Sequence, residues 1–256
     1  MEMVSTVQNT DVKQKDADRA LVVAVTTRAV FDAAAGDVYG MGVAFPLLQS
    51  LQKVNERLLE KNPAESLLFD VVLIATDSQQ QSSRIISSTS HYGLEVGRFC
   101  FSSREDLVET LVVNNVQLFL STDRDEALQV SQKGVLSALL GRQEAPSESL
   151  RVMLCGDAIV RPDCDPVPAS RGAAQSFSAR LGEMRGRFGV SGSPLSIVLV
   201  TSSGGSKSCG VALQTLRSRG LSVDEAYCLA GAPRGPILSL LRPHFLLGDG
   251  VIDLED

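Results

Sequence analysis

The sequence predicts an α/β protein made of two units, each built around a parallel β-sheet. Three observations support this fold class. Apolar, β-branched runs recur along the chain, as expected for strands buried on both faces of a sheet. Segments with helical spacing of apolar residues separate these runs, which is typical of crossovers between parallel strands. The order of the runs in residues 20–141 recurs in residues 150–256.

The composition indicates a folded chain without a nucleic-acid or membrane surface. The 256 residues are 44% hydrophobic, which is enough for a buried core. The net charge is −6 and Lys and Arg form no run, so we expect neither nucleic acid nor a membrane as a partner. No apolar run approaches the roughly 18 residues that cross a bilayer. Residues 1–19 mix acidic and basic side chains and are expected to be a flexible N-terminal tail.

The numbers of cysteines and histidines limit the kinds of site that the chain could form. The five cysteines are an odd number without a C-x-x-C pair, which predicts neither a disulfide framework nor a zinc knuckle and favours a reduced, cytoplasmic location. The two histidines, His91 and His244, leave little material for histidine metal sites or Ser-His-Asp catalysis. We expect both histidines to be structural.

Residues 20–141 form the first predicted unit. Its strands are predicted at residues 20–25, 69–75, 98–101 and 116–120. Four apolar residues on one helical face predict a helix from Pro46 to about Asn62. They are Leu47, Leu51, Val54 and Leu58. Further helices are predicted before Gly93 and over roughly residues 125–140, and the polar residues 142–149 are predicted to be a linker.

Residues 150–256 form the second predicted unit. Its strands are predicted at residues 150–154, 196–200, 226–229 and 243–247. A helix is predicted after a Pro-rich loop, on the spacing of Phe177, Leu181, Met184 and Phe188. Another helix is predicted to end at Gly220.

The two units align as an internal pseudo-repeat. Equivalent landmarks lie at offsets of 129 (Thr26 and Cys155), 126 (Val72 and Val198), 127 (Gly93 and Gly220) and 127 (Ser121 and Gly248). In parallel sheets of this kind, ligands bind beyond the carboxyl ends of the strands. The residues that directly follow each strand are therefore the candidate site.

In the second unit these residues could supply phosphohydrolase chemistry. Such a site needs a carboxylate nucleophile that also binds Mg²⁺, which is absent here. It also needs a second carboxylic acid, a hydroxyl that holds the phosphoryl group, a cation and a distal acid for the metal. Asp157, Thr201, Arg234 and Asp249 could fill those roles. The strand and turn over residues 150–160 resemble the first motif of haloacid-dehalogenase-type phosphohydrolases, which ends in Asp-x-Asp. Cys155 stands in the place of the first, nucleophilic aspartate.

Longer strings resemble the cytosolic 5′-nucleotidase type I family. They include ALVVAVTTRAVFD (residues 20–32), AFPLLQSLQKVNERLLE (44–60), LFDVVLI (68–74), ALQTLRSRGL (212–221) and LAGAPRGPIL (229–238). The resemblance spans nearly the whole chain after the tail. It implies a Rossmann-like, haloacid-dehalogenase-like fold and Mg²⁺-dependent hydrolysis of nucleoside monophosphates, chiefly AMP.

Three departures from the family pattern fall on residues to which the resemblance assigns catalysis or metal binding. Where the family has Asp-Gly-Asp, this chain has Cys155-Gly156-Asp157. Where the family has Ala-Pro-Lys-Gly and Asp-Asp, this chain has Arg234 and Gly248 in place of the lysine and the first aspartate. Since Mg²⁺ prefers hard oxygen ligands, only Asp157 and Asp249 remain as metal ligands, and we expect Mg²⁺ binding to be weak or lost.

Attack by the Cys155 thiolate is the less favoured interpretation, because no Cys-x5-Arg loop follows it: Arg161 lies six residues on and precedes Pro162. A small, buried apolar role for Cys155 is favoured. The predicted phosphate-binding or nucleotide-binding residues are Gly156, Thr201, Ser202, Ser203 and Arg234. The segment 201–208 fits an anion site at a helix N-terminus and a plain turn equally well.

The rim of the first unit carries Thr26, Arg28, Asp32, Asp77, Ser121 and Asp123. A polar domain-interface role is favoured there over a second active site. For the whole chain, the favoured hypothesis is a catalytically impaired relative that acts as a nucleotide-binding, regulatory or structural protein, with an AMP-like ligand. The alternatives are an active Mg²⁺-dependent 5′-nucleotidase that uses Asp157 and Asp249, and a structural subunit with a protein partner or a second copy of itself.

Overall fold

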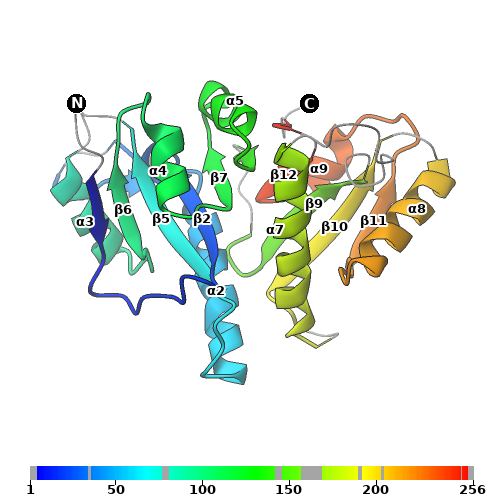
Figure 1. Cartoon of the computed structure of the whole chain (residues 1–256), viewed down its shortest axis with the longest axis horizontal. Helices are drawn as coiled ribbons and strands as arrows, with labels where there is room; N and C mark the ends of the chain where they lie inside the picture. Colours follow the sequence, from blue (N-terminus) through cyan, green and yellow to red (C-terminus); the bar gives the residue numbers. More distant parts are fainter. Residues whose placement is uncertain are drawn as a thin grey trace.

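A computed structural model describes residues 5–33, 36–76, 81–141, 146–156, 169–189, 192–202, 205–248 and 250–252. Two sheets lie side by side, each flanked by helices (Figure 1). The first sheet has the order β1 (Ser5–Gln8), β6 (Arg98–Phe101), β5 (Phe69–Ala75), β2 (Leu21–Thr26), β7 (Leu118–Ser121) and β8 (Ser137–Leu139). The second has the order β11 (Glu225–Cys228), β10 (Leu195–Thr201), β9 (Leu150–Cys155) and β12 (Phe245–Leu247).

The α/β fold class with two parallel-sheet units is confirmed. All pairings in both sheets are parallel apart from that of β1 with β6. The central strands β2 and β5 are buried along their whole length, which explains their uninterrupted apolar runs. A short ribbon of β3 (Phe31–Asp32) and β4 (Gly40–Met41) lies outside both sheets.

Strand order and register repeat between the units. The order β6-β5-β2-β7 corresponds to β11-β10-β9-β12. The registers agree residue for residue at the sequence offsets: Leu21 pairs with Phe69 and Leu150 with Leu195; Val23 with Leu118 and Val152 with Phe245; Val72 with Arg98 and Val198 with Glu225. The units are therefore an internal pseudo-repeat at the level of individual pairs.

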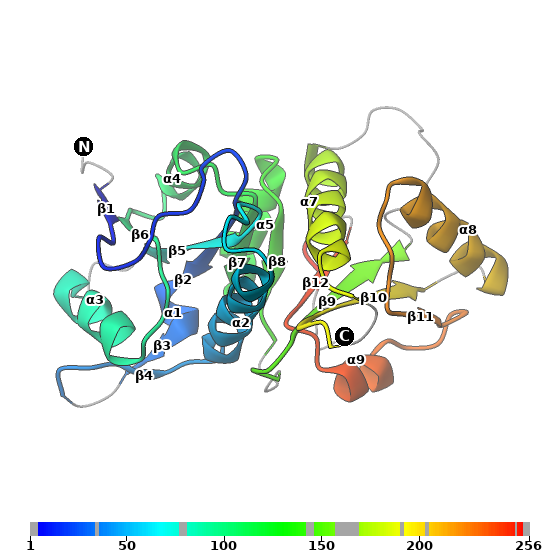
Figure 2. The same ribbon diagram turned by 90° about the horizontal axis from the view of Figure 1, so that it is seen from below.

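Helices join the units through a shared core. The helices are α1 (Thr27–Val30), α2 (Phe45–Lys61), α3 (Ser82–His91), α4 (Leu107–Val113), α5 (Arg124–Gln132), α7 (Ala169–Gly186), α8 (Gly205–Ser218) and α9 (Gly235–Leu241). Helix α2 contacts β5 of its own unit and β9 of the other, and lies near the boundary between the units (Figure 2). One apolar cluster includes Leu51 of α2, Leu154 of β9 and Phe177 of α7. None of the described helices is long and apolar enough to cross a membrane.

The predicted helix over residues 125–140 is wrong in its second part. Helix α5 ends at Gln132, and Ser137–Leu139 form strand β8, which pairs in parallel with β7. Gly134 adopts a positive φ of 87°, which ends the helical path at low cost for a residue without Cβ. The apolar residues that follow then add an edge strand instead of another helical turn.

The N-terminal segment differs from the flexible tail expected over residues 1–19. Strand β1 pairs antiparallel with β6, and the Asn9 side-chain amide donates to the Val96 carbonyl at 2.9 Å. Lys15 forms an ion pair with Glu95 at 3.2 Å. The open edge of β6 offers backbone groups that need partners, and β1 supplies them. The boundaries at residues 20, 142 and 150 stay predictions.

Candidate functional site

The candidate site lies at the carboxyl ends of β9, β10 and β12, where parallel strands bring their last residues together. Cys155 is the last residue of β9 and pairs with Val200 of β10, and Gly248 follows β12 directly. A Cβ atom built on Gly248 would lie 3.4 Å from the Cβ of Cys155. Side chains at these two positions would therefore face the same small space.

The space beside Gly248 is filled by an apolar side chain. The Cδ1 atom of Ile252 lies only 2.1 Å from a Cβ built on Gly248. Cys155 and Ile252 both pack against the apolar cluster on this face of the second sheet. A carboxylate at position 248 would thus require the end of the Ile252 side chain to move.

Gly156 and Thr201 form the next part of the site. A Cβ on Gly156 would lie 2.5 Å from Thr201 Cγ2 and 3.2 Å from Leu199 Cδ1, so this turn admits only glycine without rearrangement. Thr201 is 1% exposed, and its hydroxyl donates to the Tyr227 carbonyl at 3.5 Å. The hydroxyl thus has a structural partner in β11.

Arg234 directly precedes α9 and is half-buried. Among the residues that the structure describes, its side chain has no ion pair or hydrogen bond. Helix α9 contributes Leu238 and Leu241 to the apolar cluster that also contacts Cys155. Helix α9, which Arg234 precedes, and the Cys155 position therefore belong to the same face of the second sheet.

The structure describes only some of the remaining predicted site residues. Ser202 follows β10, and its carbonyl accepts the backbone N–H of Gly231 at 2.8 Å. Asp157, Ser203 and Asp249 lie outside the described residues. The structure thus brings Cys155, Gly156, Thr201 and Gly248 to one sheet edge, and leaves the two predicted metal ligands as predictions.

Two positions of the described site supply no oxygen ligand for a magnesium ion, and the two predicted ligands, Asp157 and Asp249, lie outside the described residues. Position 155 offers a soft sulfur and position 248 offers no side chain, although Mg²⁺ binds through oxygen ligands. Within the described ranges, no three His, Cys, Asp or Glu side chains form a group that could hold a metal.

Comparison with known proteins shows which family the chain belongs to. A model of the 5′-nucleotidase family matches residues 33–165 and 163–256. The chain belongs to the 5′-nucleotidase family. Human (Homo sapiens) cytosolic 5′-nucleotidase 1B is 32% identical over 242 residues, which cover 84% of this chain and 40% of that protein. This 5′-nucleotidase family member therefore spans well under half the length of that relative.

The solved structures that match this family member are only weakly similar to it. An O-GlcNAc transferase mutant from Thermobaculum terrenum shares 9% identity at a TM-score of 0.29, over 91% of this chain and 48% of that one. An actinorhodin polyketide ketoreductase with NADPH shares 10% identity at a TM-score of 0.26, over 85% and 98%. Likeness at this level supports no statement about function.

The rim of the first unit forms a polar network around Glu126, a residue that was not singled out from the sequence. Glu126 is 2% exposed and accepts from Ser121 Oγ at 2.9 Å and Thr76 Oγ1 at 3.2 Å, and it pairs with Arg28. Asp123 caps α5 and lies 3.7 Å from Arg28. The spacing of an N-cap residue and a glutamate three positions later is a sequence signal that could have indicated Glu126.

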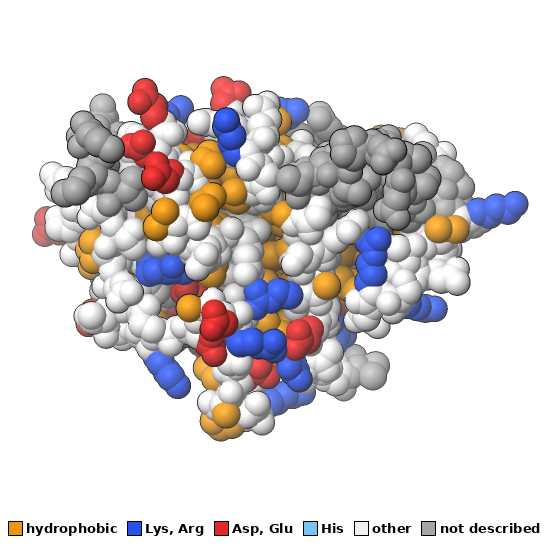
Figure 3. Space-filling view, in the orientation of Figure 1, with side chains coloured by type: hydrophobic (Ala, Val, Ile, Leu, Met, Phe, Trp, Pro, Cys, Tyr) orange, Lys and Arg blue, Asp and Glu red, His pale blue; other side chains and the backbone are white. Residues whose placement is uncertain are grey.

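Other rim residues of the first unit do not join this network. The hydroxyl of Thr26 is buried and has no hydrogen-bond partner within the described ranges, while Asp32 is exposed in β3. Asp77 lies outside the described residues. On the face shown in Figure 3, acidic and basic side chains are interspersed instead of forming a large basic surface.

Proposed function

We propose that this member of the 5′-nucleotidase family binds nucleoside monophosphates and has lost their Mg²⁺-dependent hydrolysis. The observation that carries the proposal is the 3.4 Å approach of a Cβ at position 248 to the Cβ of Cys155. Two positions that converge on one small space offer neither of the oxygen ligands that the family resemblance implies. Both changes therefore weaken the same metal site.

Loss of the metal would remove two contributions to hydrolysis. A bound Mg²⁺ would polarise the phosphoryl group and neutralise charge on its oxygens. A thiol at position 155 is a poor ligand for this hard cation, and glycine at 248 contributes nothing. Because Ile252 lies against Gly248, the described residues at this edge of the second sheet present an apolar surface.

Groups suited to binding a phosphate remain. The Arg234 guanidinium has no ion pair within the described ranges and can attract an anion, and arginine presents N–H donors that match phosphate oxygens. Helix α8 begins at Gly205, just after the strand that ends at Thr201, so its N-terminal N–H groups favour an anion nearby. Gly156, Ser202 and Ser203 complete the proposed set.

The alternative is an active hydrolase in which Asp157 and Asp249 serve as acid and metal ligand and water attacks phosphorus. The name of the human relative, cytosolic 5′-nucleotidase 1B, favours this alternative. The same name supports the proposal of a cytosolic location for this chain. Both stay proposals, because the match covers 40% of that relative.

Thermal unfolding with AMP, run alongside an assay of phosphate release from AMP with Mg²⁺, tests the proposed function. We expect AMP to raise the melting temperature, because a ligand that binds only the folded state stabilises it. We expect no phosphate release above a heat-killed control. Turnover by the unmodified protein would establish the hydrolase alternative, and no shift with any nucleoside monophosphate would overturn nucleotide binding.

A further inference from the structure

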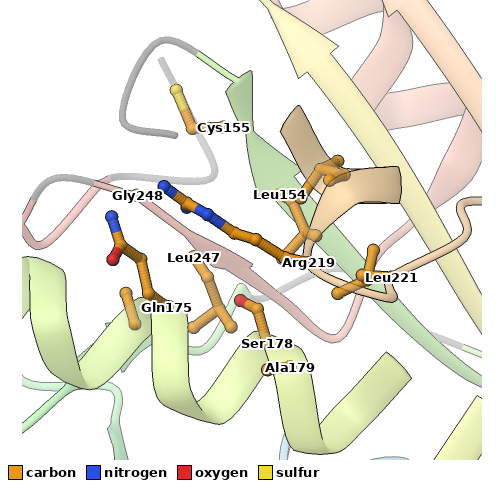
Figure 4. A pocket seen from close by; sticks show the side chains of 11 residues that line it. Leu154, Cys155, Gln175, Ser178, Ala179, Arg219, Leu221, Leu247 and Gly248 are labelled. Carbon is orange, nitrogen blue, oxygen red and sulfur yellow. The ribbon is translucent and has the colours of Figure 1, made fainter. Parts of the chain in front are cut away.

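A small pocket opens beside Cys155 and Gly248, between α7, the end of α8 and the second sheet (Figure 4). Its volume is about 30 Å³, and its walls are largely apolar, including Leu154, Leu216 and Leu247. A single water needs about 10–15 Å³ by this kind of measure, so the enclosed space suits one small group and not a whole nucleotide.

Three polar side chains also line this pocket. Gln175 and Ser178 project from α7, and Arg219 extends from beyond the C-terminal end of α8 toward Gly248 (Figure 4). Across the described ranges, none of these three side chains forms a hydrogen bond or an ion pair. A cation without a counter-charge and two unused polar groups, set against apolar walls, are typical of a ligand site.

We propose that the Arg219 guanidinium supplies the positive charge that the altered metal site no longer holds, and binds the phosphoryl group of the ligand without a metal. This inference rests on the proposed function, because it assigns a new binding residue to the same strand ends. A guanidinium can donate two parallel N–H bonds to phosphate oxygens. Ser178 and Gln175 supply further donors.

The surroundings of Arg219 favour an anion in two ways. Arg219 is the one charged side chain among the described residues that line the pocket, so no carboxylate competes with an anion there. The size of the pocket admits the phosphoryl end of a nucleoside monophosphate and leaves its sugar and base outside. Inorganic phosphate should therefore bind at the same place, with lower affinity.

The test is calorimetric titration of the full chain with inorganic phosphate and, separately, with AMP, both in the presence of EDTA. The variants are Arg219→Gln, Arg219→Lys and the control Arg217→Gln. Arg217 is also exposed near the end of α8 but does not line the pocket, so both glutamine variants lose the same charge. Thermal unfolding of each variant checks that it is folded.

We expect both ligands to bind the unmodified protein in EDTA and Arg219→Gln to raise each Kd by about tenfold or more. Arg219→Lys should fall between these values, and Arg217→Gln should match the unmodified protein. Equal affinities for Arg219→Gln and the unmodified protein would overturn the role of Arg219 while nucleotide binding stands. Equal losses in both glutamine variants would also overturn it, since they would reflect net charge alone.

Comparing phosphate with AMP distinguishes failure of the role proposed for Arg219 from failure of the proposed nucleotide binding. Phosphate binding that depends on Arg219, without tighter binding of AMP, would support the anion site and contradict the proposed nucleotide function. Absence of binding by either ligand would overturn both.

Discussion

The Nε2 atom of His244 lies 3.3 Å from the Oγ of Ser50, and this contact joins the two units of the pseudo-repeat. Ser50 belongs to α2 of the first unit, and its hydroxyl donates to the Leu47 carbonyl at 2.8 Å. His244 Nδ1 accepts the backbone N–H of Arg151 at 3.0 Å. Since Nδ1 accepts, the imidazole is neutral and carries its proton on Nε2, where Ser50 Oγ and the backbone of Pro146 are partners.

This buried imidazole predicts a loss of stability in acid. Burial lowers the pKa of His244 from its ordinary value of 6.5 to about 4. The unfolded chain therefore binds more protons between these values, so the contribution of His244 is present above pH 6.5 and is lost as the pH falls toward 4. The full effect is about 3 kcal/mol in the free energy of unfolding.

Denaturant unfolding at pH 7.5 and pH 4.5 measures this effect. The unmodified protein should lose more stability between the two pH values than His244→Gln, which has no group to protonate. His91→Gln is the control, because it replaces the other histidine of the chain, which is exposed. The same pH dependence in His244→Gln and the unmodified protein would contradict the assignment.

Replacement of Glu126 should destabilise the first unit. Glu126→Gln removes a charge that Arg28 and Ser121 contact in a buried setting, and should lower the free energy of unfolding by about 2 kcal/mol. The control is Glu60→Gln, since the Arg57–Glu60 pair is exposed and should change stability by less than about 0.5 kcal/mol. Chemical denaturation compares the two variants, and equal small effects would show that the network contributes no more than a surface ion pair.

Gly156 should resist even the smallest side chain. Gly156→Ala places a methyl group 2.5 Å from Thr201 Cγ2, and overpacking of this kind costs about 1–3 kcal/mol. Gly172→Ala within α7 is the matched control, because no atom lies within 4 Å of its Cβ and alanine favours helix by up to about 1 kcal/mol. The melting temperatures should therefore move in opposite directions. A stabilising Gly156→Ala would show that the turn has more room than this packing allows.

Much of the fold could be predicted from the sequence because its signals are local. The apolar run at residues 69–75 matches β5, and the repeat offsets anticipated the registers of three strand pairs. The helix predicted to residue 140 failed because residues 135–139 suit an edge strand as well as a helix. Strand β1 was missed because its pairing depends on the distant edge of β6.

The sequence predicted that Cys155 and Gly248 lie at one sheet edge, and it predicted the contacts at this edge only in part. Cys155 and Gly248 lie at one sheet edge because each stands at the carboxyl end of a parallel strand, as the pseudo-repeat implied. The role proposed for Arg219 could not be foreseen, since this residue follows the C-terminal end of a helix and not the end of a strand. The partner of Gly248, Ile252, likewise depends on how the chain turns back after β12.

The central claim is that positions 155 and 248 decide whether this member of the family hydrolyses AMP. The most direct measurement is phosphate release from AMP with Mg²⁺ by the unmodified protein and by Cys155→Asp, Gly248→Asp, with Ile252→Ala added to make room for the second carboxylate. We predict no release by the unmodified protein and measurable, EDTA-sensitive release by the triple variant. Release by the unmodified protein at a rate equal to that of the variant would contradict the claim.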